Sequence, residues 1–122
     1  MAALTVPILE VTSLNTATLA YGSGNVAGTI DGSDGAELTP LKKDSKYLIQ
    51  LNIVTGATIT ISAGTGLQAA QADLSTGALT GSRTYYIFLE SGRYLNTYGT
   101  NKGKILITSS QADTTILAFE LP

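Results

Sequence analysis

The stretch YLIQLNIVTGATITI, residues 47–61, contains two runs of alternating apolar and polar side chains around a glycine. Successive side chains of a strand point to opposite sides, so each run has one apolar face, made of Tyr47, Ile49, Leu51 and Ile53 in the first and of Ile59 and Ile61 in the second. The intervening Val54-Thr55-Gly56-Ala57 is short enough to join two neighbouring strands as a hairpin. These residues predict a β-structure.

The same period of two recurs toward the C-terminal end, in residues 84–90, 104–108 and 115–121. Thr100-Asn101-Lys102-Gly103 predicts a turn with Gly103 in the left-handed region. Threonine and glycine are abundant, and one short helix is expected, at Leu67–Leu74, which lacks β-branched residues. We therefore expect an all-β fold, either an antiparallel β-sandwich or a small jelly-roll-like barrel, with an extended N-terminal arm.

The expected organisation has three parts: an N-terminal arm or edge strand (1–21), a glycine-rich connection (22–35) and the sandwich or barrel body (36–122). Pro7 cannot donate a ladder hydrogen bond, which restricts its segment to a sheet edge or to an extended arm. Both alternatives stay open: an edge strand of the same domain, or an arm that adds to a neighbouring subunit.

Charge is sparse, since 13% of the residues are Asp, Glu, Lys or Arg and neither Val11–Ile30 nor Tyr47–Ala72 contains any of these. The net charge of −2 argues against nucleic acid as a partner, which requires clustered Lys and Arg. Residues 47–72 are too polar to cross a membrane, and the first residues lack the basic region of a secretory signal, so an intracellular product is expected. The uncharged regions are expected to contact other subunits or a lattice.

Catalytic chemistry is not expected. The chain has neither Cys nor His, so it can build neither a thiolate or Cys/His zinc site nor a histidine-activated nucleophile. Residues 64–69, GTGLQA, match a dinucleotide-binding pattern, but no βαβ unit surrounds them, and a glycine-rich turn is the preferred interpretation. We predict a protein that is not an enzyme and that holds no cofactor.

Two charged clusters have both a plain and a functional interpretation. The carboxylates of Asp31, Asp34 and Glu37 suit a solvated turn, or alternatively a calcium site. Lys42, Lys43 and Lys46 suit a solvated strand entry, or alternatively contact with an acidic protein surface.

Several predicted strands are apolar on both faces, as where Tyr86 and Phe88 alternate with Tyr85, Ile87 and Leu89. A sandwich strand that faces water on one side should not have this composition, so another subunit is expected to cover part of the second face. Around this strand we expect either an ordinary strand end or an interface rim, formed by Arg83, Tyr86, Phe88, Arg93 and Tyr94.

The apolar N-terminal segment, the uncharged Thr- and Gly-rich body and the run ESGRYLNTYGTNKGKILIT (Glu90–Thr108) resemble small bacteriophage virion proteins, above all head decoration or cement proteins. This resemblance implies a non-enzymatic homo-oligomer, often a trimer, that assembles in the host cytoplasm and binds the major capsid protein on the capsid exterior. It also implies that the N-terminal segment contacts the lattice or a subunit, through Leu4, Val6, Pro7, Ile8, Leu9 and Val11.

Two alternatives remain at this stage. One is a glycan- or receptor-binding module of a phage fibre, in which Tyr94 and Tyr98 would stack on a sugar beside Asn96 and Asn101. The other is a tail-tube or connector subunit.

Overall fold

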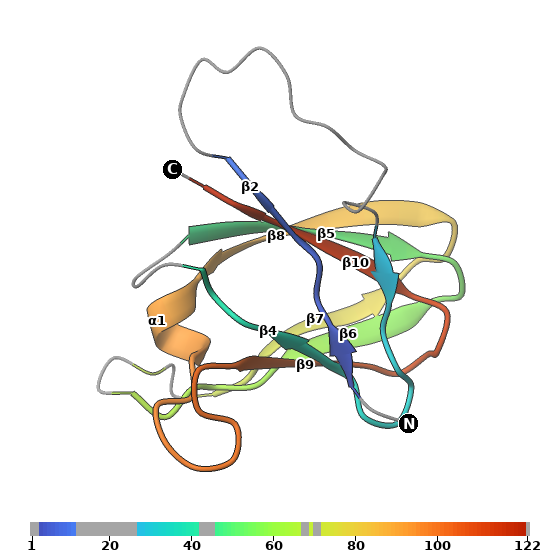
Figure 1. Cartoon of the computed structure of the whole chain (residues 1–122). Helices are drawn as coiled ribbons and strands as arrows, with labels where there is room; N and C mark the ends of the chain where they lie inside the picture. Colours follow the sequence, from blue (N-terminus) through green and yellow to red (C-terminus); the bar gives the residue numbers. More distant parts are fainter. Residues whose placement is uncertain (1–2, 12–26, 42–45, 67–68, 70–71, 122) are drawn as a thin grey trace.

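The computed structural model describes residues 3–11, 27–41, 46–66, 69 and 72–121. It confirms the all-β prediction, and of the two expected forms it is the sandwich: two sheets face each other across one core (Figure 1). The sheets are mixed, because the N-terminal strands pair in parallel while the other pairs are antiparallel.

Sheet I has the order β1-β4-β9-β6-β7. Its strands are β1 (Leu4–Thr5), β4 (Ala36–Leu38), β9 (Ile105–Ser109), β6 (Ala57–Ile61) and β7 (Leu74–Leu79). Sheet II has the order β2-β10-β5-β8, and a short β3 also pairs with β10. Its strands are β2 (Ile8–Glu10), β10 (Thr115–Glu120), β5 (Lys46–Ile53), β8 (Arg83–Glu90) and β3 (Gly28–Thr29).

The core lies between the sheets and uses the predicted faces of the central strands. The inward side chains of β5, β6 and β9 are almost fully buried, as expected from their alternation: Tyr47, Ile49, Leu51, Ile53, Ala57, Ile59, Ile61, Ile105 and Ile107. On β10, Ile116, Ala118 and Glu120 share the face that points inward, so a carboxylate takes a core position.

The predicted hairpin at residues 54–57 is wrong. The strands on its two sides, β5 and β6, belong to different sheets, so this turn crosses the sandwich. Among the described strands, only β6 and β7 are consecutive in the chain and paired with each other. Alternation predicts a strand and its two faces but does not identify its neighbour, and that is why the connection was assigned incorrectly.

The expected helix at Leu67–Leu74 is also wrong where it can be described, because Leu74 begins β7; residues 67, 68, 70 and 71 lie outside the described residues. The helix that does form, α1, is the single turn Ser91–Tyr94, and the N–H of Leu95 donates to the carbonyl of Ser91 at 2.9 Å. The turn at Thr100–Gly103 is confirmed, with Gly103 at φ 82°.

The N-terminal segment lies at the edges of its own sandwich, which is the edge-strand alternative. β1 pairs in parallel with β4, and β2 pairs in parallel with β10, so the chain changes sheets at Val6 and Pro7 (Figure 1). The carbonyl of Pro7 accepts from the N–H of Ala118 at 3.0 Å, and the side chain of Val6 is buried in the core. The sandwich also begins before residue 36, because β3 and the buried Ile30 belong to it.

Candidate interaction surface

The outer face of β8 carries the aromatic side chains with the highest exposed fractions in the described sheets. Phe88 is 76% exposed and Tyr86 56%, whereas Leu89 on the opposite face is buried. Tyr85 and Ile87, also on the inner face, pack against the core. β8 therefore anchors one face in the sandwich and presents aromatic rings on the other.

Phe88 stands at the end of a row that crosses the whole outer face of sheet II. Phe88 is directly opposite Leu48, Leu48 is opposite Phe119, and Phe119 is opposite Leu9. Side chains at directly opposed positions lie on the same face of a sheet and contact each other. The row is most exposed at Phe88, since Leu48 and Phe119 are partly exposed and Leu9 is buried.

An open hollow of about 290 Å³ adjoins this end of the row. Its lining consists of Lys46, Tyr47, Phe88, Leu89, Glu90 and Leu121. Lys46 and Glu90 are opposed across β5 and β8, so the hollow has an aromatic wall and a cation and an anion at its rim. Such a surface suits the side chains of another protein, which combine apolar bodies with polar ends.

The predicted rim is divided between two elements. Arg83, Tyr86 and Phe88 lie on β8 and are exposed, and Arg93 is exposed on α1. Tyr94 is partly buried and packs against the core. Tyr86 and Phe88 thus form the continuous part of the surface, which we call the aromatic face of β8.

Beside this face, the start of β8 is held to the loop that precedes it. The N–H of Thr80 donates to the hydroxyl oxygen of Tyr85 at 3.1 Å. This hydrogen bond stabilises the phenolate and so lowers the pKa of Tyr85 below its ordinary value.

The N-terminal residues were predicted to touch a lattice. In this structure they pack within their own domain. Val6 and Leu9 are buried, and Leu4 and Ile8 pack against the core. The N–H of Val11 donates to the carbonyl of Glu120 at 2.8 Å. A role of Leu4, Val6, Pro7, Ile8, Leu9 and Val11 in contacts between molecules stays a prediction.

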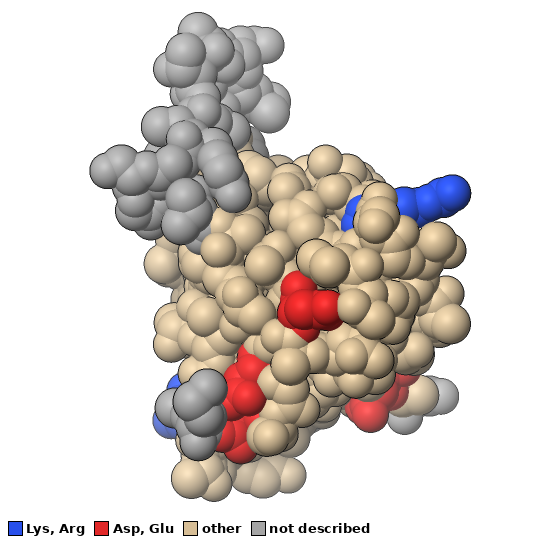
Figure 2. Space-filling model, turned by 90° about the vertical axis from the view of Figure 1, so that its right-hand side faces the viewer, with Lys and Arg blue, Asp and Glu red and all other residues tan. Residues whose placement is uncertain are grey.

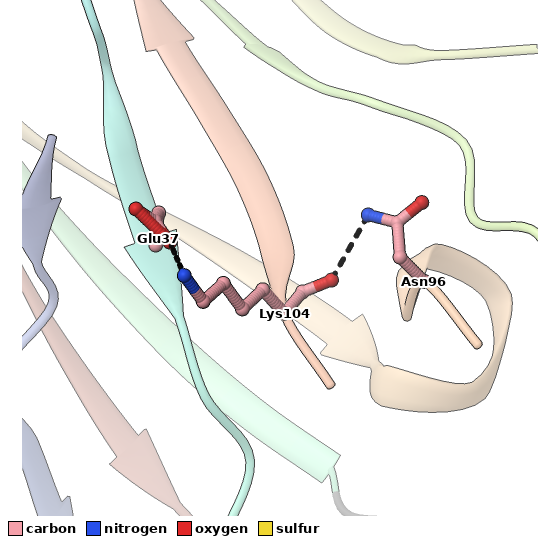
Figure 3. Close-up of polar contacts among 3 residues, drawn as sticks. All are labelled: Glu37, Asn96 and Lys104. Atoms are coloured by element: carbon pink, nitrogen blue, oxygen red, sulfur yellow. Dashed lines mark hydrogen bonds and ion pairs between the residues drawn. The ribbon is translucent and has the colours of Figure 1, made fainter. Parts of the chain in front are cut away.

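The residues of the glycan alternative do not form a shared platform. Tyr98 is 69% exposed, but the Asn96 side chain is buried, and its Nδ2 donates to the carbonyl of Lys104 at 3.0 Å (Figure 3). Tyr94 packs against the core, as described above. The amide of Asn96 stabilises the 96–104 loop.

Two of the three carboxylates of the calcium alternative, those of Asp31 and Glu37, are engaged in different ways. Oδ1 of Asp31 accepts from the N–H of Ser33 at 3.1 Å, which is turn geometry. Glu37 pairs with Nζ of Lys104 at 2.5 Å (Figure 3). Within the described ranges, no group of three acidic side chains is placed to hold a metal ion.

Charge is sparse on the side of the molecule that Figure 2 shows. Figure 2 shows one side of the molecule, where uncharged side chains cover most of the surface and charged ones occur in small separate groups. The uncharged stretch from residue 47 to 61 has a structural explanation, because β5 and β6 are interior strands of the two sheets. Of the lysine cluster, Lys46 begins β5, while Lys42 and Lys43 lie outside the described residues.

The row across sheet II was not predicted from the sequence. Leu48 and Phe119 are far apart in the chain, and only the strand register brings them together.

In the part of the chain that the structure describes, no helix is both long and apolar enough to cross a bilayer. No protein-family model, no curated protein and no solved structure matches the chain.

Proposed function

We propose that this chain is a non-enzymatic structural protein that binds other protein molecules through the outer face of sheet II. Within that class we propose a virion head decoration protein, bound to the capsid exterior, as the resemblance of the sequence implies. The observation that carries the proposal is the exposure of Tyr86 and Phe88 on a regular strand, at the end of an in-register apolar row.

Aromatic side chains on a rigid strand are well suited to protein binding. They bury a large area and lose little conformational freedom, and tyrosine is among the residues that most often dominate binding energy. Exposed apolar patches of this kind commonly mark interaction sites. The inner face of β8 holds the two rings in place because Leu89 is buried in the core.

The proposal assigns the lattice contact to the aromatic face of β8 and not to the N-terminal segment. Val6 is already buried in the core, so docking it on a capsid would require β1 to leave its sheet. The aromatic rings require no such rearrangement. Binding to the assembled shell alone would stabilise that shell by mass action.

The test is cosedimentation with shells assembled from the major capsid protein of the genome that encodes the chain. We expect replacing Tyr86 and Phe88 together by Ser to weaken binding by about tenfold or more, the effect of losing roughly 1.4 kcal/mol. Tyr98→Ser is the matched control, since Tyr98 is an equally exposed aromatic residue in a loop, and it should bind as the parent does. Unchanged binding by the double variant would overturn the proposal.

A further inference from the structure

The edge of β8 differs from the other sheet edges among the described strands. β1 and β2 have two and three residues. β7 is interrupted by a register shift opposite Thr58 and Thr60 and contains Gly77 at φ 70°. Such short or distorted edges protect a sheet from pairing with another chain.

β8 has none of these protections. All eight of its residues pair with β5 in an unbroken register, and the strand contains neither proline nor lysine. In the described part of the chain, no strand pairs with its outer edge. An edge of this length and regularity is a template for a further strand.

The backbone direction shows which residues would pair there. The N–H of Leu121 donates to the carbonyl of Lys46 at 2.9 Å, so Lys46 directs its backbone groups toward β10. In an antiparallel sheet the direction alternates along the strand, so Tyr47 directs its groups toward β8, where its partner is Leu89. The groups that point to the outer edge are therefore those of Thr84, Tyr86, Phe88 and Glu90.

The charges of β8 identify the partner that this edge fits. The strand begins with Arg83 and ends with Glu90. A second β8 in antiparallel orientation would bring the end of each copy that carries Arg83 next to the end of the other that carries Glu90, with the two side chains on opposite faces of the sheet. A parallel orientation would bring like charges together, which is unfavourable. The edge is thus complementary to itself.

We propose that two copies of this chain pair through their β8 edges in antiparallel orientation, around a twofold axis at Ile87. In this register Tyr86 of each copy lies opposite Phe88 of the other, and Thr84–Glu90 overlap completely. The inference deepens the proposed function, on which it rests, because it joins two aromatic faces into one surface. A twofold contact of this kind builds a dimer and not the trimer that the resemblance implies.

The first test is the mass of the chain by light scattering at tens of micromolar, without shells. The parent is expected to be a dimer. Phe88→Pro should be a monomer, because it removes an N–H that points outward and leaves the ladder to β5 intact. Phe88→Val is the control: it keeps that N–H and should remain largely dimeric, because it weakens dimerisation less than proline does. A monomeric parent would overturn the inference.

The second test examines the register and does not depend on proline being tolerated. The chain contains no cysteine, so Tyr86→Cys and Phe88→Cys each introduce a single thiol. Directly opposed Cα atoms lie about 5.5 Å apart and diagonal ones about 7–8 Å, and a disulfide requires about 4.4–6.8 Å. A mixture of the two variants should cross-link on mild oxidation several times more than either variant alone. Equal cross-linking in the three samples would overturn the proposed register.

The outcomes separate this inference from the proposed function. A monomeric parent that still sediments with shells would refute the β8 pairing and leave the decoration role in place. A dimer with the expected cross-link that does not bind shells would refute the decoration role and leave the pairing in place.

Discussion

The hydroxyl of Tyr47 donates a hydrogen bond to Oε2 of Glu120, and the two residues are directly opposed on β5 and β10. Both side chains are buried. The N–H of Leu41 donates to the same carboxylate oxygen at 3.0 Å, so the residue that follows β4 by three positions is held at this corner of sheet II. A buried carboxylate is tolerated when such donors surround it.

Tyr47→Phe should lower the free energy of unfolding by about 1–3 kcal/mol, because the substitution removes one donor to a buried carboxylate. Urea denaturation followed by circular dichroism measures the change. Tyr98→Phe removes a hydroxyl from an exposed ring and is expected to have no measurable effect. Equal stability of the two variants would show that the Tyr47 hydroxyl does not support Glu120.

The two faces of β8 should respond differently to truncation. Leu89→Ala removes a buried side chain and should cost about 2–5 kcal/mol of stability. Phe88→Ala, at the adjacent exposed position, should change it by no more than about 0.5 kcal/mol in a monomeric sample. Thermal unfolding at low protein concentration compares them, and a large loss at Phe88 would contradict its outward position.

Two glycines with similar backbone angles should tolerate alanine differently. Gly35 has φ 74° and Gly99 has φ 84°, so both substitutions carry the left-handed penalty of about 1–2 kcal/mol. A Cβ at Gly35 would also collide with the carbonyl of Ile107, whereas a Cβ at Gly99 meets nothing within 4 Å. Gly35→Ala should therefore be less stable than Gly99→Ala by about 1–3 kcal/mol in urea denaturation. Equal losses would argue against the close approach of Gly35 to β9.

The ion pair between Lys104 and Glu37 should contribute little. Their side chains are 39% and 26% exposed, so solvent screens the attraction. Lys104→Met is expected to cost less than about 1 kcal/mol, and the difference from the parent should shrink in high salt. Denaturation at low and high ionic strength measures this, and a loss that is large and independent of salt would contradict it.

Tyr85 should ionise at a lower pH than an ordinary tyrosine. The N–H of Thr80 stabilises its phenolate, so the pKa of Tyr85 is lowered in the folded state. The folded state then gains stability as pH rises through this lowered pKa; the gain is complete above the unfolded pKa and is lost as pH falls. The ultraviolet absorbance difference between the parent and Tyr85→Phe, followed against pH, should give a pKa below the ordinary value of a tyrosine. A pKa at or above the ordinary value would contradict the Thr80 contact.

The sequence allowed the strands to be predicted, but not their neighbours. The alternation from Tyr47 to Ile53 correctly identifies the core face of β5, because burial of one face is a local pattern. On β10, both faces are apolar enough to belong to the core. The face that points inward contains Glu120, whose carboxylate accepts hydrogen bonds from Tyr47 and Leu41, on other elements.

The same distinction applies to the candidate surface. Tyr86 and Phe88 were expected at an interface from the composition of one strand. The row that joins Phe88 to Phe119 depends on the register of three strands and on the order of sheet II, which no local pattern contains. The hairpin expected at residues 54–57 failed for the same reason.

The parallel pairing of β2 with β10 has a consequence for synthesis of the protein. Residues 8–10 leave the ribosome more than a hundred residues before their partners at 118–120. Until then β2 has no sheet partner, although β1 can already pair with β4. Closure of the sandwich must therefore wait until β10 has been made, and an apolar segment that waits this long is a natural target for chaperones.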